Sequence, residues 1–143
     1  MKKLFVILGI TIITLLTNSG SAMHYVQTSS ETLTLNNGAR WKIDNTTNNN
    51  VKEIKTILAG FDKGENRSLN AYHNTANDLR SGLNKMIREC KMKGPDHLAL
   101  HKWLEPLMEQ VAKLKQASNT AEAARSFSAI RLQLNRYDQY FEI

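Results

Sequence analysis

Four amphipathic segments, with apolar residues at alternating steps of three and four, constrain this chain more than any other feature. That spacing places apolar side chains on one face of an α-helix, and such a face must be buried. The four seams are Val51, Ile54, Leu58 and Phe61; Leu69, Tyr72, Ala76, Leu79, Leu83, Met86 and Cys90; His97, Leu100, Leu104, Leu107, Val111 and Leu114; and Ala123, Phe127, Ile130, Leu134, Tyr137 and Phe141. The sequence therefore predicts a mainly α protein, an antiparallel four-helix bundle in which the seams face one another.

Short polar breaks separate the four segments, near residues 63–67, Gly94 and Ser118. Gly94 followed by Pro95 predicts the end of one helix and the start of the next, because glycine terminates helices and proline fits a first helical turn. Asn119 with Glu122 predicts a capping box for the last helix. Pro106 lies inside the third segment, where its missing N–H predicts a kinked or divided helix.

The first 22 residues are typical of a secretory signal peptide. Two lysines precede an apolar run at residues 4–16, and small residues at 19–22 suit cleavage. The run is shorter than the ~20 apolar residues of a membrane-spanning helix, so we expect no stable membrane span after cleavage. We expect removal of residues 1–22, a flexible lead-in at 23–30, and one helical-bundle domain at 31–143 in a periplasmic or secreted protein.

An N-terminal β-hairpin is predicted at residues 31–43. Asn36, Asn37 and Gly38 separate two short alternating runs, and Gly38 can adopt the positive φ of a three-residue loop with a bulge. In this register Leu35 lies opposite Ala39, and one face carries Leu33, Leu35, Trp41 and Ile43. We expect that face to cap the helices, because an isolated hairpin is marginally stable in water.

Motifs for catalysis are missing from the sequence. It contains no GxSxG, no HExxH, no phosphate-binding glycine loop and no CxxCH. No pair of carboxylates falls on an apolar seam, where burial could separate their pKa values. The single cysteine excludes an intramolecular disulfide and any four-cysteine metal site. We therefore expect a protein that is not an enzyme.

The chain is basic, with a formal net charge of +6. A local basic cluster consists of Lys85, Arg88, Lys91 and Lys93, but no aromatic residues interleave with it as stacking on bases would require. We interpret this cluster as a solvated helix end and expect no nucleic-acid partner. For an exported protein, the positive charge favours anionic envelope surfaces.

One group of residues points to chemistry at the break between the second and third segments. Cys90 ends one seam and His97 begins the next, so a chain reversal at Gly94 brings their side chains to the same end of the core. His101 lies one helical turn after His97 on the same face. We expect these three side chains to converge on one point.

A thiolate, two imidazoles and a thioether form a soft donor set that favours copper, with zinc as the second choice. We expect a metal site made of Cys90, His97, His101 and Met92, with Met86 as an alternative to Met92. A protein with such a site would act as a metal carrier, buffer or sensor.

Several alternatives remain at this stage. Cys90 is explained equally well as a small core residue, and the histidines as groups that cap the backbone or face water. An exposed Cys90 could instead link a homodimer through a disulfide, because export leads to an oxidising compartment. The chain would then be a metal-free module that contacts an envelope protein or an anionic surface.

Overall fold

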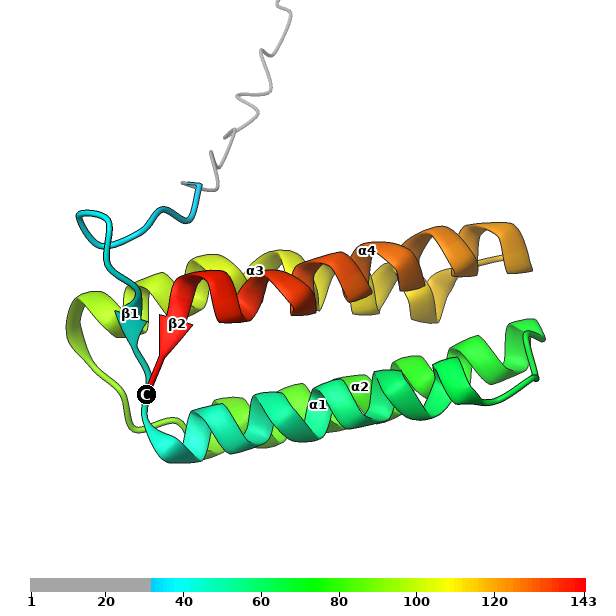
Figure 1. Ribbon diagram of the computed structural model, residues 1–143. Coiled ribbons are helices and arrows are strands. Elements are labelled where there is room, and N and C mark those ends of the chain that lie inside the picture. Colours follow the sequence, from blue (N-terminus) through cyan, green and yellow to red (C-terminus); the bar gives the residue numbers. More distant parts are fainter. Residues whose placement is uncertain (1–31) are drawn as a thin grey trace, which may run out of the picture.

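A computed structural model describes residues 32–143 (Figure 1). The predicted signal peptide at 1–22 and the lead-in at 23–30 lie outside the described residues. In chain order the elements are β1 (Trp41–Lys42), α1 (Asn45–Lys63), α2 (Leu69–Glu89), α3 (Gly94–Gln116), α4 (Thr120–Tyr140) and β2 (Phe141–Glu142). The prediction of a mainly helical protein with four helices is confirmed, and the breaks lie where the sequence placed them.

The four helices lie lengthwise beside one another, and successive connections fall at alternating ends of the molecule (Figure 1). α1 and α2 form one layer, and α3 and α4 form the other. Both short strands lie at the end where α2 passes into α3. None of the helices within residues 32–143 combines the length and apolar character needed to span a bilayer.

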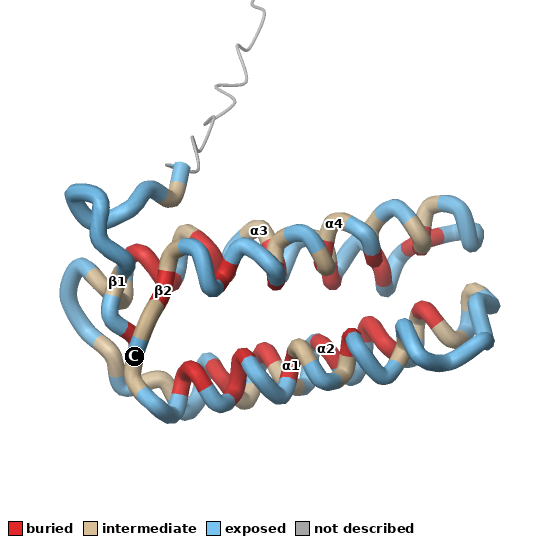
Figure 2. The backbone as a smooth tube through the Cα atoms, viewed as in Figure 1, coloured by how far each residue is buried: buried red, intermediate tan, exposed pale blue. Residues whose placement is uncertain are grey.

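The predicted seams form the core, and their buried residues face the space between the two layers (Figure 2). All seam residues are buried except four that are half-buried: Phe61, Leu69, Cys90 and His97. These four lie at the ends of their seams, where the helices approach a connection. Two of the predicted metal ligands, Cys90 and His97, therefore lie at the edge of the core.

Trp103 joins α3 to α4 from a position beside the predicted seam. Its side chain is fully buried, and its indole Nε1–H donates to the Gln133 carbonyl oxygen at 3.0 Å. The Gln133 side-chain amide donates in turn to the Trp103 carbonyl oxygen at 2.7 Å. A buried indole needs a hydrogen-bond acceptor, so this reciprocal pair lets a large side chain fill the core without an unsatisfied polar group.

The predicted cap of the last helix is present. The Asn119 side chain accepts a hydrogen bond from the Glu122 N–H at 2.9 Å, and the Glu122 carboxylate accepts one from the Ser118 N–H at 2.9 Å. Glu122 thus reaches one residue beyond the usual partner in a capping box. The hydrogen bond from the Ser118 N–H, followed by the contact with Asn119, lowers the pKa of Glu122 below its ordinary value of 4.5.

The register predicted for the hairpin is wrong. Asn36 and Ala39 exchange backbone hydrogen bonds of 2.8 and 2.9 Å around a two-residue turn, in which Asn37 and Gly38 both have positive φ. Positive φ at both central residues is typical of a type I′ turn, whose backbone twist matches that of two adjacent strands. Such a turn has no bulge, and the predicted bulge was needed to set Leu35 opposite Ala39. Leu35 is exposed as a result.

The chain after the turn pairs with residues 141–142 instead of with residues 32–35. β1 runs parallel to β2, with Trp41 opposite Phe141 and Lys42 opposite Glu142. Ile43 continues the pairing by donating its N–H to the Glu142 carbonyl oxygen at 2.8 Å. The pairing buries Ile43 and Phe141 against the helices, which an exposed antiparallel hairpin could not do.

The division of the third helix that Pro106 suggested does not occur. α3 continues through Pro106 from Gly94 to Gln116. Leu104 and Leu107, on either side of the proline, are both buried in the core. Packing of this face against the bundle outweighs the loss of one helical hydrogen bond.

We predict that Trp103→Ala lowers the free energy of unfolding by about 3–5 kcal/mol, because it removes a fully buried aromatic ring and leaves a cavity between α3 and α4. Urea unfolding followed by circular dichroism measures this change. Leu132→Ala is the control, since Leu132 on α4 is 66% exposed and its truncation should change stability by less than about 0.5 kcal/mol. Equal losses in the two variants would contradict the packing role of Trp103.

Glu122→Gln should make the free energy of unfolding less dependent on pH in the acidic range. The pKa of Glu122 is lowered in the folded chain, so its carboxylate stabilises the fold above pH 4.5, and this stabilisation disappears as the pH falls through the lowered pKa. Urea midpoints of parent and variant should differ at pH 7 and converge at low pH. Asn119→Ala should lose about 1 kcal/mol at pH 7 and less in acid, because the Asn119 contact also lowers the pKa of Glu122. A gap between parent and Glu122→Gln that widens on acidification would contradict this account.

Candidate metal site

The candidate site lies at the connection between α2 and α3, where the chain reverses. Cys90 follows the last residue of α2 and closes that helix by donating its N–H to the Met86 carbonyl oxygen at 2.9 Å. Gly94 has φ +73°, a conformation that glycine adopts without steric cost. Gly94 also begins α3, Pro95 follows in its first turn, and the helix carries His97 in that turn and His101 in the next. The reversal therefore brings Cys90 next to α3.

Three of the predicted site residues form a continuous chain of contacts. The Cys90 Sγ lies 3.7 Å from the His97 Nδ1. The opposite ring nitrogen, His97 Nε2, lies 2.8 Å from the His101 Nε2. The two imidazole rings are 4.5 Å apart between centroids and inclined by 47°. His97 is thus the central member, with Cys90 on one side and His101 on the other.

The site borders both the core and the solvent. Cys90 and His97 are half-buried, whereas His101 is exposed. Cys90 and Met92 also pack against the hydrophobic core. The Cys90 thiol therefore contacts apolar side chains of the core and is also partly exposed to solvent. An ion from solution can reach it without unfolding of the bundle.

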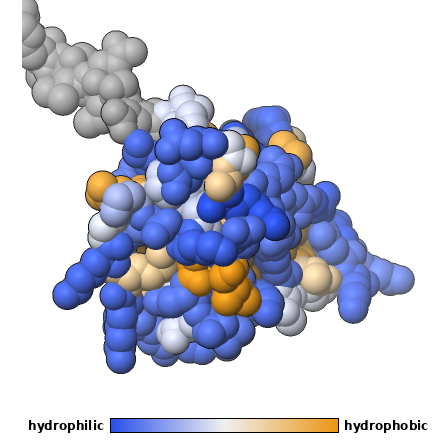
Figure 3. All heavy atoms as spheres, turned by 60° about the vertical axis from the view of Figure 1, so that its left-hand side comes forward, coloured by the Kyte–Doolittle hydropathy of each residue, from blue (hydrophilic) through white to orange (hydrophobic). Residues whose placement is uncertain are grey.

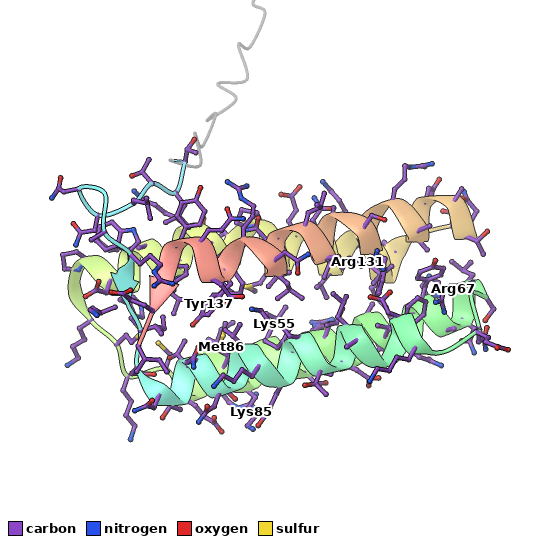
Figure 4. All side chains as sticks on the ribbon, viewed as in Figure 1. Lys55, Arg67, Lys85, Met86, Arg131 and Tyr137 are labelled. Atoms are coloured by element: carbon purple, nitrogen blue, oxygen red, sulfur yellow. The ribbon has the colours of Figure 1, made fainter. Side chains whose placement is uncertain are left out.

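The two methionines considered as sulfur donors lie in different surroundings. Met86 is 1% exposed and projects from α2 into the bundle interior (Figure 4). Met92 is half-buried in the connection between α2 and α3, two residues after Cys90. Met86 is therefore explained by core packing, whereas Met92 keeps some exposure to solvent and stays the candidate sulfur donor.

The three nitrogen and sulfur donors are adjacent, but they do not surround one point. His97 faces Cys90 with one ring nitrogen and His101 with the other. Among residues 32–143, no group of three or more histidine, cysteine, aspartate or glutamate side chains is arranged to hold a metal ion. Cys90 and His97 alone form a two-donor pair in this arrangement.

The separation within this pair matches that of two ligands on one ion. With typical metal–sulfur and metal–nitrogen bonds of about 2.3 and 2.0–2.1 Å, donors 3.7 Å apart subtend roughly 115–120° at the ion. This angle lies between tetrahedral and trigonal values. A soft ion could therefore occupy the space between Cys90 Sγ and His97 Nδ1 without a large movement of either side chain.

The second contact of His97 determines which of its nitrogens is free to bind. If His97 Nε2 carries the proton and donates it to His101 Nε2, the lone pair of His97 Nδ1 faces Cys90. Ligand histidines in metal sites commonly donate their other ring N–H to such an outer partner, which fixes the ring. His101 suits that supporting role.

Sequence reasoning missed the contact that anchors the start of α3. The Asp96 carboxylate accepts a hydrogen bond from the Lys42 N–H of β1 at 3.0 Å. The Lys42 side chain pairs with Glu142 of β2 at 2.8 Å. The strand pair thus holds the first turn of α3, directly before His97. An acidic residue in a first helical turn is common for electrostatic reasons alone, so Asp96 by itself did not indicate this partner.

Comparison with known proteins adds no family. No protein-family model, curated protein or solved structure matches this chain.

Gly94→Ala should destabilise the fold by about 1–2 kcal/mol, because an L-residue is strained at φ +73° even though open space surrounds the added Cβ. Thermal unfolding measures the loss. Gly60→Ala is the matched control: the same methyl group meets no neighbour in the helical α1, so it should be neutral or stabilise by up to about 1 kcal/mol. A neutral Gly94→Ala would show that the reversal does not depend on glycine.

Proposed function

We propose that this chain is an exported, non-enzymatic protein, an antiparallel four-helix bundle that binds a soft transition metal as a carrier, buffer or sensor. The observation that carries the proposal is the 3.7 Å separation of Cys90 Sγ and His97 Nδ1 at the α2–α3 connection. Cys90 and His97 act as ligands, Met92 supplies the third donor, and His101 orients His97.

Copper, in its monovalent state, is the ion that this donor set favours. Thiolate and thioether ligands select copper(I), which accepts fewer ligands than most divalent ions. Structural zinc sites instead use four ligands, and none of the groups within residues 32–143 offers even three of the usual zinc-binding side chains in position. Zinc is the second candidate, with water completing its shell.

The exposure of the site favours exchange over permanent storage. The imidazole of His101 is exposed to solvent. The cationic residues nearest Cys90 in the sequence are exposed as well: Arg88, Lys91 and Lys93. A site at the rim of the bundle can release its ion to a partner without unfolding the core. Loading replaces the thiol proton with the ion, so binding releases that proton to solvent.

The alternative is a metal-free module that binds an envelope protein or an anionic surface, as a monomer or as a dimer linked through Cys90. Leu98 supports it, because this residue of α3 is 62% exposed and lines a shallow pocket of about 150 Å³ with Leu33 and Trp41. The surface near the strand end is otherwise mainly hydrophilic, with small apolar patches (Figure 3). This patch is small for a stable interface, so metal binding ranks first.

The test is a copper(I) titration of the reduced protein under anaerobic conditions, in competition with a chromophoric chelator. Cys90→Ser and His97→Ala should each lose roughly hundredfold or more in affinity, and His101→Ala should lose about 10–100-fold, as expected for an outer partner. Met92→Leu should weaken binding by a smaller factor. X-ray absorption of the loaded parent should show one nitrogen ligand if His101 is an outer partner, and two if it binds directly.

Two substitutions serve as matched controls. His73→Ala removes a histidine whose Nε2 contacts the Ala117 carbonyl oxygen at the other end of the bundle, and Met108→Leu removes a thioether from the exposed face of α3. Both should bind copper as the parent does. If Cys90→Ser and His97→Ala also retain parental affinity and stoichiometry, the metal site is wrong and the interaction module becomes the leading hypothesis.

A further inference from the structure

A groove between α2 and α3 lies apart from the metal site. It has a volume of about 390 Å³ and is lined by residues from Ala76 to Asn84 on α2 and from Met108 to Gln116 on α3. It shares no lining residue with the Cys90, His97 and His101 cluster. Ligand pockets in proteins have volumes of about 300–1,000 Å³, so this groove can hold a small molecule.

The floor of the groove is apolar. Ala76, Leu83 and Val111 line it with side chains that are at most 3% exposed, and Met108 lies at the rim with 40% exposure. An unbranched, adaptable methionine at the rim can follow the shape of a flexible ligand. The floor therefore suits a hydrocarbon chain.

The rim of the groove is positively charged. Arg80 on α2 and Lys115 on α3 line it, and no acidic residue does so. In the described part of the chain, neither cation belongs to an ion pair. The nearby Lys113, in contrast, pairs with Glu109 at 2.6 Å and does not line the groove. Two unpaired cations on opposite helices thus face an apolar floor.

We propose that this groove binds a single-chain amphiphile with a carboxylate head, the chemical class of the fatty acids. The hydrocarbon chain lies on the floor, and the carboxylate lies between Arg80 and Lys115. The planar guanidinium of arginine matches a carboxylate with two parallel hydrogen bonds, and the lysine adds a second positive charge.

The size of the groove selects this occupant over a partner helix. A helix with its side chains is about 10–12 Å across, and a groove of 390 Å³ cannot enclose even a few of its turns. An extended alkyl chain is thin enough to lie between two helices. Binding of an amphiphile here is independent of metal binding, because the groove and the candidate metal site share no residue.

The test is isothermal titration of the protein, purified after expression of residues 1–143, with decanoate below its micelle-forming concentration. We expect one saturable site. Arg80→Gln and Lys115→Gln should each weaken binding by about tenfold, because each removes a hydrogen bond to a charged group. Ala112→Phe should abolish binding by filling the groove, and Ala112 is exposed, so the core remains intact.

Lys113→Gln is the matched control, since it makes the same charge change on the same helix outside the groove. It should keep parental affinity, and decyltrimethylammonium should show no saturable binding. The proposal fails if decanoate shows no saturable site, if Arg80→Gln and Lys113→Gln bind equally, or if Ala112→Phe leaves affinity unchanged. It also fails if the cationic amphiphile binds as well as decanoate.

Discussion

Burial of four apolar seams against one another is the constraint on which the rest of this structure depends. Each helix carries a face that is unstable in water, and the four faces remove one another from solvent without a disulfide. The geometry of the candidate site follows from this packing. Cys90 and His97 are the terminal members of two adjacent seams, so the burial that aligns α2 with α3 also brings the thiol to the imidazole.

The sequence was sufficient to predict what depends on periodicity. Helix number, helix breaks and almost the whole core follow from the spacing of apolar residues, because a 3.6-residue repeat places the apolar residues of each segment on one face. Side-chain chemistry also located the Asn119 cap. The hairpin register was not predictable in this way, since two or three loop residues are both compatible with Asn37 and Gly38. Pairing of Trp41 with Phe141 joins residues a hundred positions apart, and no local pattern encodes such a contact.

The candidate site shows the same division between what sequence predicts and what it cannot. Helical spacing places His97 and His101 one turn apart, and the reversal at Gly94 places Cys90 beside them. Spacing does not determine which ring nitrogen faces which neighbour, because that depends on side-chain rotation. In the structure His97 lies between its two partners, and Cys90 and His101 contact opposite nitrogens of its ring. The groove between α2 and α3 was missed because its cations lie on two different helices.

The parallel strand pair ties together two segments that lie a hundred positions apart in the sequence. Phe141 belongs to the core, and Glu142 contacts both the Ile43 N–H and the Lys42 side chain in the segment that precedes α1. Within residues 32–143 neither strand has another strand to pair with. The two strands therefore form or separate together, which couples the segment before α1 to the end of α4.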